Sequence, residues 1–263
     1  MKNGKNTTEE SISLLKIMKS VIDASEKIVL EKHVGDLNIR RNRYAQLRCM
    51  GLAHAIFNDI VVIIEINKSA RTVELLLRPL IELYVNFMWL GIGRGIGNYA
   101  VFVADDNYKV ARQIDHILKF HRKIGSEQKE IEDWTKVQDL NHEQAKHALK
   151  LTTVLDGTET FPSITKRAQE IDLSRDTKNA FEWLVLYPYS FAHRAVHVSN
   201  SWLNHMVDEE TGEILLDGSP DQLEHAAVDA LSIFLGMLTD YQRIFKIEYD
   251  LEQYWDMIPN SRL

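Results

Sequence analysis

Cysteine is almost absent from this chain, because Cys49 is the only one among 263 residues. No disulfide can form within the chain, which excludes a small secreted fold held by such bonds and fits a reducing compartment. The first ten residues are polar, with no apolar stretch after a basic start, so the sequence predicts no secretory signal. We therefore expect a cytoplasmic protein.

Proline and glycine are scarce as well, with five and twelve residues respectively. Long stretches without either residue favour helices over many short strands. The sequence predicts an all-α fold, an irregular multi-helix bundle, with a small hairpin near residues 208–220. No linker rich in proline or serine interrupts the chain, so we predict a single helical domain over residues 1–263.

Apolar runs that could cross a membrane are also rare. The run 60–64 has only five residues, and the run 73–92 contains Glu74, Arg78 and Glu82, which are costly in a bilayer. We interpret both runs as buried core helices and expect no membrane partner.

The predicted helices cover most of the chain. Their approximate ranges are 7–35, 37–64, 68–90, 99–124, 126–137, 143–151, 164–171, 176–207 with a break at Pro188, and 220–247. The aromatic tail 249–263 is expected to pack back onto the bundle.

Acidic residues dominate overall, giving a net charge of -7, but the two halves of the chain differ. Residues 1–124 carry 19 basic and 13 acidic side chains, whereas residues 125–263 carry 12 and 25. An acidic surface argues against general nucleic-acid binding. The segment Arg40–Arg48 nevertheless holds four arginines, so an RNA partner would be attracted there.

Polar residues on the helix 68–90 form one narrow stripe on an otherwise apolar cylinder. At about 100° per residue, the members of this face are Arg71, Arg78, Glu82 and Asn86, with Glu74 at its edge. A helix that is apolar over most of its circumference is central in a bundle. The stripe is then either a thin exposed edge with internal ion pairs or the wall of a polar cleft.

The segment 187–207 presents a second unusual polar face. From Ser190 to Val207 it contains no Asp, Glu or Lys, although ordinary solvated helix faces are rich in Lys and Glu. The composition therefore predicts a hydrogen-bonding surface that is buried or lines a cleft. The residues assigned to it are Ser190, His193, Arg194, His197, Asn200, Ser201 and Asn204.

The spacing of His193 and His197, four residues apart, suits two metal ligands on one helix face. The segment lacks the glutamate of the H-E-x-x-H zinc motif, and no Glu-x-x-His for a di-metal bundle lies nearby. We assign no metal and no cofactor. The plain alternative is a pair of core histidines bonded to carboxylates or carbonyls.

Metal-free ribonuclease chemistry is a third interpretation. Histidine can remove the 2′-hydroxyl proton, and arginine can stabilise the charge that develops on phosphorus. Helical bacterial toxins and phage-defence ribonucleases of the higher-eukaryote-and-prokaryote nucleotide-binding class place Arg and His on one helix with four to six residues between them. Arg194 and His197 have two residues between them, whereas Arg48 and His54 have five and follow the basic segment.

Two segments resemble a bacterial family known only as a domain of unknown function. They read R-T-V-E-L-L-L-R-P-L-I-E-L-Y-V-N and Y-P-Y-S-F-A-H-R-A-V-H-V-S, and the similarity covers about residues 45–205. The resemblance implies an all-helical fold with Arg78, Glu82 and His197 as shared polar residues. It implies no established activity.

We therefore predict a site in a polar cleft between the helices 68–90 and 187–207. Its catalytic residues are predicted to be His193, Arg194, His197, Arg78 and Glu82. Its substrate-binding residues are predicted to be Arg71, Tyr187, Ser190 and Asn200. The predicted function is a metal-independent ribonuclease-like toxin or phage-defence effector. The alternative is a non-catalytic helical module that binds a protein partner or forms a homo-oligomer.

Overall fold

The computed structural model describes residues 6–29, 41–66, 69–92, 96–150, 160–190, 192, 215 and 217–258. Every regular element in these ranges is a helix, which confirms the all-α prediction. The hairpin predicted near residues 208–220 falls mostly on 208–214 and 216, outside the described residues.

The chain divides into two compact units, which are described separately. The larger unit comprises residues 1–39, 46–89 and 164–263, and the smaller comprises 40–45 and 90–163. The expectation of a single domain stays a prediction.

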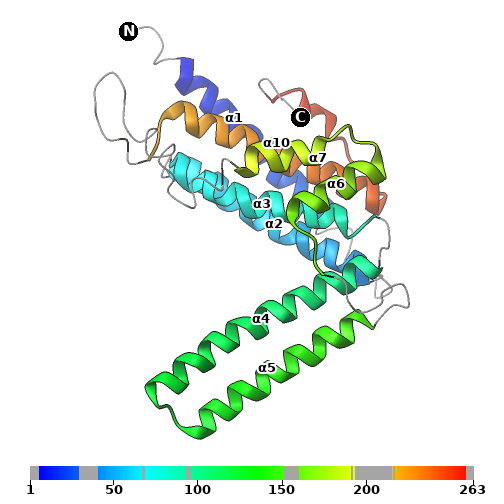
Figure 1. Cartoon of the computed structure of the whole chain (residues 1–263). Coiled ribbons are helices and arrows are strands. Elements are labelled where there is room, and N and C mark those ends of the chain that lie inside the picture. The colour runs from blue at the N-terminus through cyan, green and yellow to red at the C-terminus, as the bar shows by residue number, and fades with distance from the viewer. Residues whose placement is uncertain are drawn as a thin grey trace. The chain divides into compact units, whose positions relative to one another are not determined.

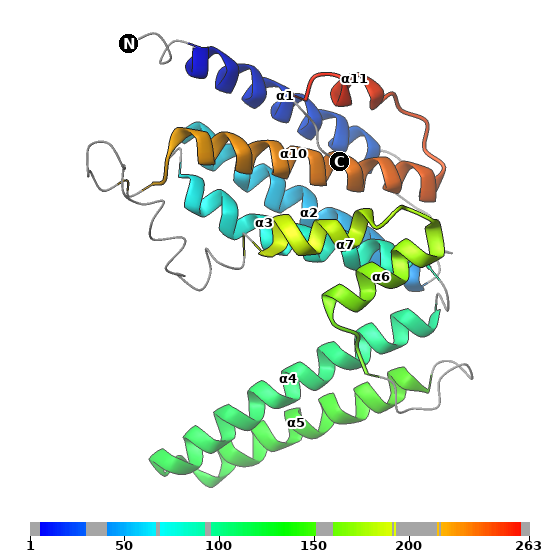
Figure 2. The same cartoon turned by 45° about the horizontal axis from the view of Figure 1, so that its top comes forward.

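The larger unit is organised around two long helices, α3 (Ala70–Trp89) and α10 (Pro220–Phe245), which lie side by side (Figures 1 and 2). α1 (Asn6–Val29) packs along α10. Most of α2 (Arg41–Ile66) belongs to the same unit, and its Phe57 stacks on Phe234 of α10 with ring centroids 4.3 Å apart. Both rings are fully buried, so this contact lies at the centre of the core.

Shorter elements complete the larger unit. They are α6 (Ile164–Arg175), α7 (Ala180–Leu184), the π-helical turn η1 (Val185–Tyr189) and α11 (Glu252–Trp255). The predicted return of the tail is confirmed, because the Trp255 indole donates to Thr239 of α10 at 3.3 Å. The Gln242 amide of α10 likewise donates to the Tyr249 carbonyl at 2.8 Å.

α3 is the central helix that its sequence predicts, since no residue between 70 and 89 is exposed. Pro79 lies inside it and removes one backbone hydrogen bond. Its neighbours Leu77, Leu80 and Ile81 are at most 3% exposed. Their burial stabilises the helix on both sides of Pro79, because tertiary packing outweighs the low helix propensity of proline.

The start of α10 is fixed by local hydrogen bonds. Ser219 Oγ accepts from the Gln222 backbone N–H, and the Gln222 side chain accepts from the Ser219 N–H, which together form a capping box. Pro220 occupies the first helical position, where its missing N–H costs nothing. These three residues explain why the predicted start at residue 220 is correct.

The smaller unit is a long antiparallel pair, α4 (Ile96–Ile124) and α5 (Gln128–Leu149) (Figures 1 and 2). The buried residues of its interface include four alanines, which let the helix axes approach closely: Ala104, Ala111, Ala145 and Ala148. The sequence predicted two helices, 126–137 and 143–151, where the structure has one. No proline or glycine separates them, and the Asn141 side chain donates to the Val137 carbonyl within the continuous helix.

The predicted helix 176–207 begins later than expected. Asp176, Lys178 and Asn179 have φ angles of 53°, 52° and 65°, so residues 176–179 form a turn before α7. At Pro188, where the sequence predicts a break, the helix instead continues as the π-helical turn η1. A proline has no backbone N–H to donate within a helix, and the wider π-helical turn accommodates the proline here.

α2 is, among the helices described, the one that is long and apolar enough to cross a membrane by length and composition. The predicted burial holds for one of its faces, because Ile60 and Val61 are at most 3% exposed. The other face departs from the prediction of a buried core helix, because Leu52, Val62 and Ile66 are 54%, 42% and 70% exposed.

Candidate functional site

The polar stripe of α3 meets η1 at three side chains. The Arg78 Nε lies 3.3 Å from Glu82 Oε1, and the Tyr189 hydroxyl donates to the same oxygen at 2.8 Å. The Arg78 guanidinium lies 5.3 Å from the centre of the Tyr189 ring. We call these residues the Arg78–Glu82–Tyr189 cluster. It joins the two segments between which the sequence predicts a site.

The cluster is half-buried, which changes how its groups ionise. Burial raises the pKa of Tyr189, and the hydrogen bond to Glu82 raises it further, so the phenol remains a donor at neutral pH. Burial opposes the charged form of Arg78, but Tyr189 and Glu82 outweigh it and raise the pKa of the guanidinium. The Arg78 and Glu82 side chains are still 29% and 40% exposed, so a ligand in solution could contact them.

The α3 stripe continues toward α6. Asn86 accepts a hydrogen bond from the buried Arg167, and the Trp89 indole donates to Glu170 at 2.7 Å. The stripe is therefore a half-buried polar seam and not a freely solvated edge. The ion pair expected within the helix, Arg78 with Glu82, is present inside this seam.

Other residues assigned to the site lie apart from the cluster or outside the described part of the chain. Ser190, the residue after η1, donates to the Val185 carbonyl at 3.3 Å. Tyr187 is 54% exposed and stacks on Trp183, with ring centroids 5.5 Å apart. Arg71 is half-buried and lies two turns before Arg78, a rise of about 10 Å along the helix.

The residues His193, Arg194, His197 and Asn200 lie outside the described residues, as does Arg40 of the basic segment. Their assigned roles stay predictions. Of the other arginines in that segment, Arg41 and Arg48 are exposed and Arg43 is half-buried.

The alternative motif of Arg48 and His54 lies on α2, and its role stays a prediction. The His54 Nδ1 lies 2.7 Å from the Ser25 hydroxyl of α1, and its ring packs toward Phe234 of α10. Arg48 is exposed and His54 is half-buried. His54 therefore contacts both α1 and α10.

Metal-ligating side chains do not gather in the part of the chain that the structure describes. No three His, Cys, Asp or Glu residues there lie close enough to hold an ion. Cys49 is buried, which raises the pKa of its thiol to about 12.

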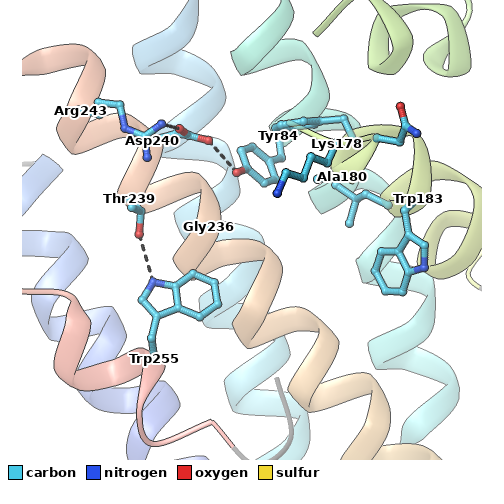
Figure 3. Close-up of a pocket in the computed structure, with 12 residues that line it drawn as sticks. Tyr84, Lys178, Ala180, Trp183, Gly236, Thr239, Asp240, Arg243 and Trp255 are labelled. Atoms are coloured by element: carbon cyan, nitrogen blue, oxygen red, sulfur yellow. Dashed lines mark hydrogen bonds and ion pairs between the residues drawn. The ribbon is translucent and has the colours of Figure 1, made fainter. Parts of the chain in front are cut away.

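The structure contains a pocket that the sequence did not predict. It has a volume of about 620 Å³ and lies between Tyr84 of α3, Thr239 and Asp240 of α10, Trp255 of α11 and the turn before α7. Figure 3 shows Trp255 and Trp183 on opposite sides, with Tyr84 and Lys178 between them. Sequence reasoning placed Tyr84 among the apolar residues of α3 and so missed its hydroxyl.

A hydrogen-bonded carboxylate lies in the wall of this pocket. The Tyr84 hydroxyl donates to Asp240 Oδ2 at 2.7 Å, and Arg243 and Arg175 approach Oδ1 at 3.3 and 3.6 Å. Burial raises the pKa of Asp240, and these three donors offset only part of that effect. Gly236 makes room for the Tyr84 ring, because a Cβ there would lie 3.3 Å from the phenol oxygen.

The turn before α7 is held by one buried carboxylate. Asp172 accepts from the backbone N–H groups of Phe181 at 3.1 Å and Glu182 at 2.8 Å, and so caps α7. It also accepts from the Thr177 hydroxyl. These bonds present Lys178 and the first residues of α7 to the pocket. The sequence did carry a signal for this turn, since Asp172 is followed by the polar run Thr177-Lys178-Asn179. The predicted helix start at residue 176 did not take this run into account.

Comparison with protein families identifies this chain. A family of unknown function, DUF5677, matches residues 44–214, well over half of the chain. The chain belongs to this family, as the resemblance in the sequence indicated. The match includes α3, α6, α7 and η1, and it ends before α10. Neither the curated proteins nor the solved structures give a match to this chain.

Proposed function

We propose that this chain is a metal-independent ribonuclease that acts as a toxin or phage-defence effector, with its site at the Arg78–Glu82–Tyr189 cluster. The observation that carries the proposal is the contact between this α3 pair and Tyr189. Tyr189 directly precedes the segment of His193, Arg194 and His197 in the sequence. His193 follows Tyr189 by four residues, and the proposal places its side chain at the cluster.

The proposed reaction is a transfer within the RNA followed by release of a 5′-hydroxyl end. His197 accepts the proton of the 2′-hydroxyl, and the 2′-oxygen attacks the adjacent phosphorus. The bond from phosphorus to the 5′-oxygen breaks, and His193 donates a proton to that oxygen. The other product carries a 2′,3′-cyclic phosphate.

Cationic groups have a separate role in this reaction. Arg78 and Arg194 stabilise the negative charge that develops on phosphorus, and Glu82 holds Arg78 in position. Tyr189 donates to the same Glu82 oxygen that contacts Arg78, and the guanidinium lies over the ring of the tyrosine. The remaining predicted residues, Arg71, Tyr187, Ser190 and Asn200, would contact the RNA.

The test is incubation of the protein with total cellular RNA in the presence of a chelator. We expect cleavage by the wild type and a loss of about 100-fold or more in His197→Ala, the size of a missing general base. His116→Ala is the matched control, because His116 is an exposed histidine on α4. Expression in growing cells should arrest growth with the wild type and not with His197→Ala. Wild-type protein that leaves RNA intact, or His197→Ala that cleaves equally well, contradicts the proposal.

A second candidate function rests on the exposed face of α2. Leu52, Ala55, Asp59, Val62 and Ile66 are all exposed and follow one another at intervals of three and four residues. This spacing is that of a seam between two packed helices. A non-catalytic module that forms a homo-oligomer through α2 would bury it.

The oligomeric state measured by light scattering after size-exclusion chromatography tests this candidate. If α2 forms an interface, Ile66→Glu should convert a dimer into a monomer. Leu173→Glu is the matched control, because Leu173 is an apolar residue of α6 that is 87% exposed. A wild-type monomer at all concentrations excludes the seam as a homo-oligomer interface.

A further inference from the structure

We propose that the pocket between α3, α7, α10 and α11 binds a small organic anion that has a planar ring. Its volume of about 620 Å³ lies in the range of small-molecule sites. The pocket is distinct from the Arg78–Glu82–Tyr189 cluster, and the inference does not depend on the ribonuclease proposal. Its α10 and α11 wall lies entirely beyond the family match, which ends at residue 214.

Aromatic side chains define the ring-binding part of the pocket. Trp183, Trp255, Phe181 and Tyr84 all line it, and Figure 3 shows the two tryptophans on opposite sides. Trp183 and Trp255 are both half-buried, so part of each ring is available to a ligand. Rings of this kind prefer stacked or edge-to-face partners, which favours a planar ligand over a branched aliphatic one.

Positive charge is in excess around the pocket. Asp240 is the single carboxylate in its wall, and it already has Arg243 and Arg175 within 3.6 Å. Lys178 adds a further ammonium group, and among the described residues it forms no ion pair. A ligand with one negative group near Lys178 and Arg243 would neutralise part of this excess.

The backbone that presents Lys178 is in a costly conformation. Asp176, Lys178 and Asn179 all have positive φ, and none of them is glycine. Such residues persist where the surrounding structure determines their geometry, and they cluster at ligand clamps. Here Asp172 fixes the geometry of the turn, because its carboxylate accepts hydrogen bonds from the Thr177 hydroxyl and from the Phe181 N–H at the start of α7. Lys178 is therefore held over the pocket before a ligand arrives, which lowers the entropy cost of binding.

A pair of fluorescent probes that differ in charge tests the proposal on the full chain. Anilinonaphthalene sulfonate carries two aromatic groups and one negative charge, and N-phenylnaphthylamine is its uncharged analogue. We expect saturable binding of the sulfonate at one site, weakened by added salt. Lys178→Met should weaken it about 3- to 10-fold, the effect of one partly exposed charge, and should leave the uncharged probe within about twofold.

The control variant is Lys246→Met. Lys246 also has a positive φ, of 56°, but lies at the end of α10 and does not line the pocket. The same backbone strain is therefore kept in both variants, and only the position of the lost charge differs. A ring contact is tested by Trp183→Leu, which should weaken both probes, with Trp134→Leu on α5 as its control.

The proposal is overturned if the sulfonate binds Lys178→Met as tightly as it binds Lys246→Met, or if it binds without saturation. Equal effects of Trp183→Leu and Trp134→Leu would also contradict it. None of these results depends on RNA cleavage, so failure of this inference and failure of the ribonuclease proposal are distinguishable.

Discussion

Asp240 is a buried carboxylate on α10, and its burial disfavours its charge. Burial raises its pKa above the ordinary value of an aspartate, despite the Tyr84 hydroxyl and two nearby arginines. A raised folded-state pKa means that the folded protein binds the proton more tightly than the unfolded chain does. The contribution of this group to the free energy of unfolding is therefore largest in acid. It declines as the pH rises through the window between the ordinary and the raised pKa.

Replacement of Asp240 separates its charge from its hydrogen bond. Asp240→Asn keeps an acceptor for Tyr84 and removes the buried charge, so we expect the free energy of unfolding at pH 7 to change by less than about 1 kcal/mol. Asp240→Ala leaves the Tyr84 hydroxyl without its acceptor and should lower it by about 2–3 kcal/mol. Urea unfolding at pH 7 measures both variants. Equal losses in the two variants would show that the charge, and not the hydrogen bond, stabilises the fold.

Cys49 provides a second test at a single side chain. Burial raises the pKa of its thiol to about 12, so almost none of it is thiolate at neutral pH. We expect a thiol reagent to react with it at pH 8 only after denaturant is added. Because the folded-state pKa is raised, the stability due to this group should fall as the pH rises above about 8.5. Rapid reaction in the native protein would contradict the buried position of the thiol.

Some residues of the candidate sites could be predicted from the sequence, and others could not. Arg78 and Glu82 could be singled out because charges on an apolar helix break the usual pattern. Tyr84 could not, because a tyrosine fits an apolar face and its partner Asp240 is 156 residues away in the chain. Helical periodicity places a side chain on a face and says nothing of which distant residue it meets.

α7 illustrates how a short helix depends on a residue outside it. Five residues cannot form a stable helix alone, and Asp172 of α6 supplies the acceptors for its first N–H groups. Asp172→Ala should lower the free energy of unfolding by about 1–2 kcal/mol, the cost of a lost helix cap. Asp172→Asn keeps one acceptor and should recover part of this loss. Thermal or urea unfolding distinguishes the two, and identical stabilities of the wild type and Asp172→Ala would contradict the capping role.

Helix boundaries were predictable where a local signal coincided with packing. The start of α10 at residue 220 was predicted, since serine, proline and glutamine form a cap within four residues. The continuity of α5 and the start of α7 were predicted less well. α5 continues through residues 138–142 because nothing there stops a helix, and the turn 176–179 adopts positive φ because Asp172 holds it. The contact of Asp172 with this turn is part of the tertiary structure, so the sequence gives only a weak signal for it.

At the scale of the chain, the family match covers the residues assigned to the predicted site. Residues 44–214 include Arg78, Glu82, Tyr189 and the histidine segment that follows. Part of the site was therefore predictable: the α3 stripe, and its contact with the segment that begins near residue 187. The pocket was not, because its walls come from elements far apart in sequence, including α10 and α11.

The central claim is that RNA is cleaved at the Arg78–Glu82–Tyr189 cluster without a metal. The most direct measurement is the rate of cleavage of an end-labelled RNA in the presence of a chelator, with the 3′ ends of the products identified. We predict 2′,3′-cyclic phosphate ends with the wild type and with Arg112→Met, a control at an exposed arginine of α4. Arg78→Met should be slower by about 100-fold or more while its melting temperature stays close to that of the wild type. Equal rates for Arg78→Met and Arg112→Met, or no cleavage by the wild type, would contradict the claim.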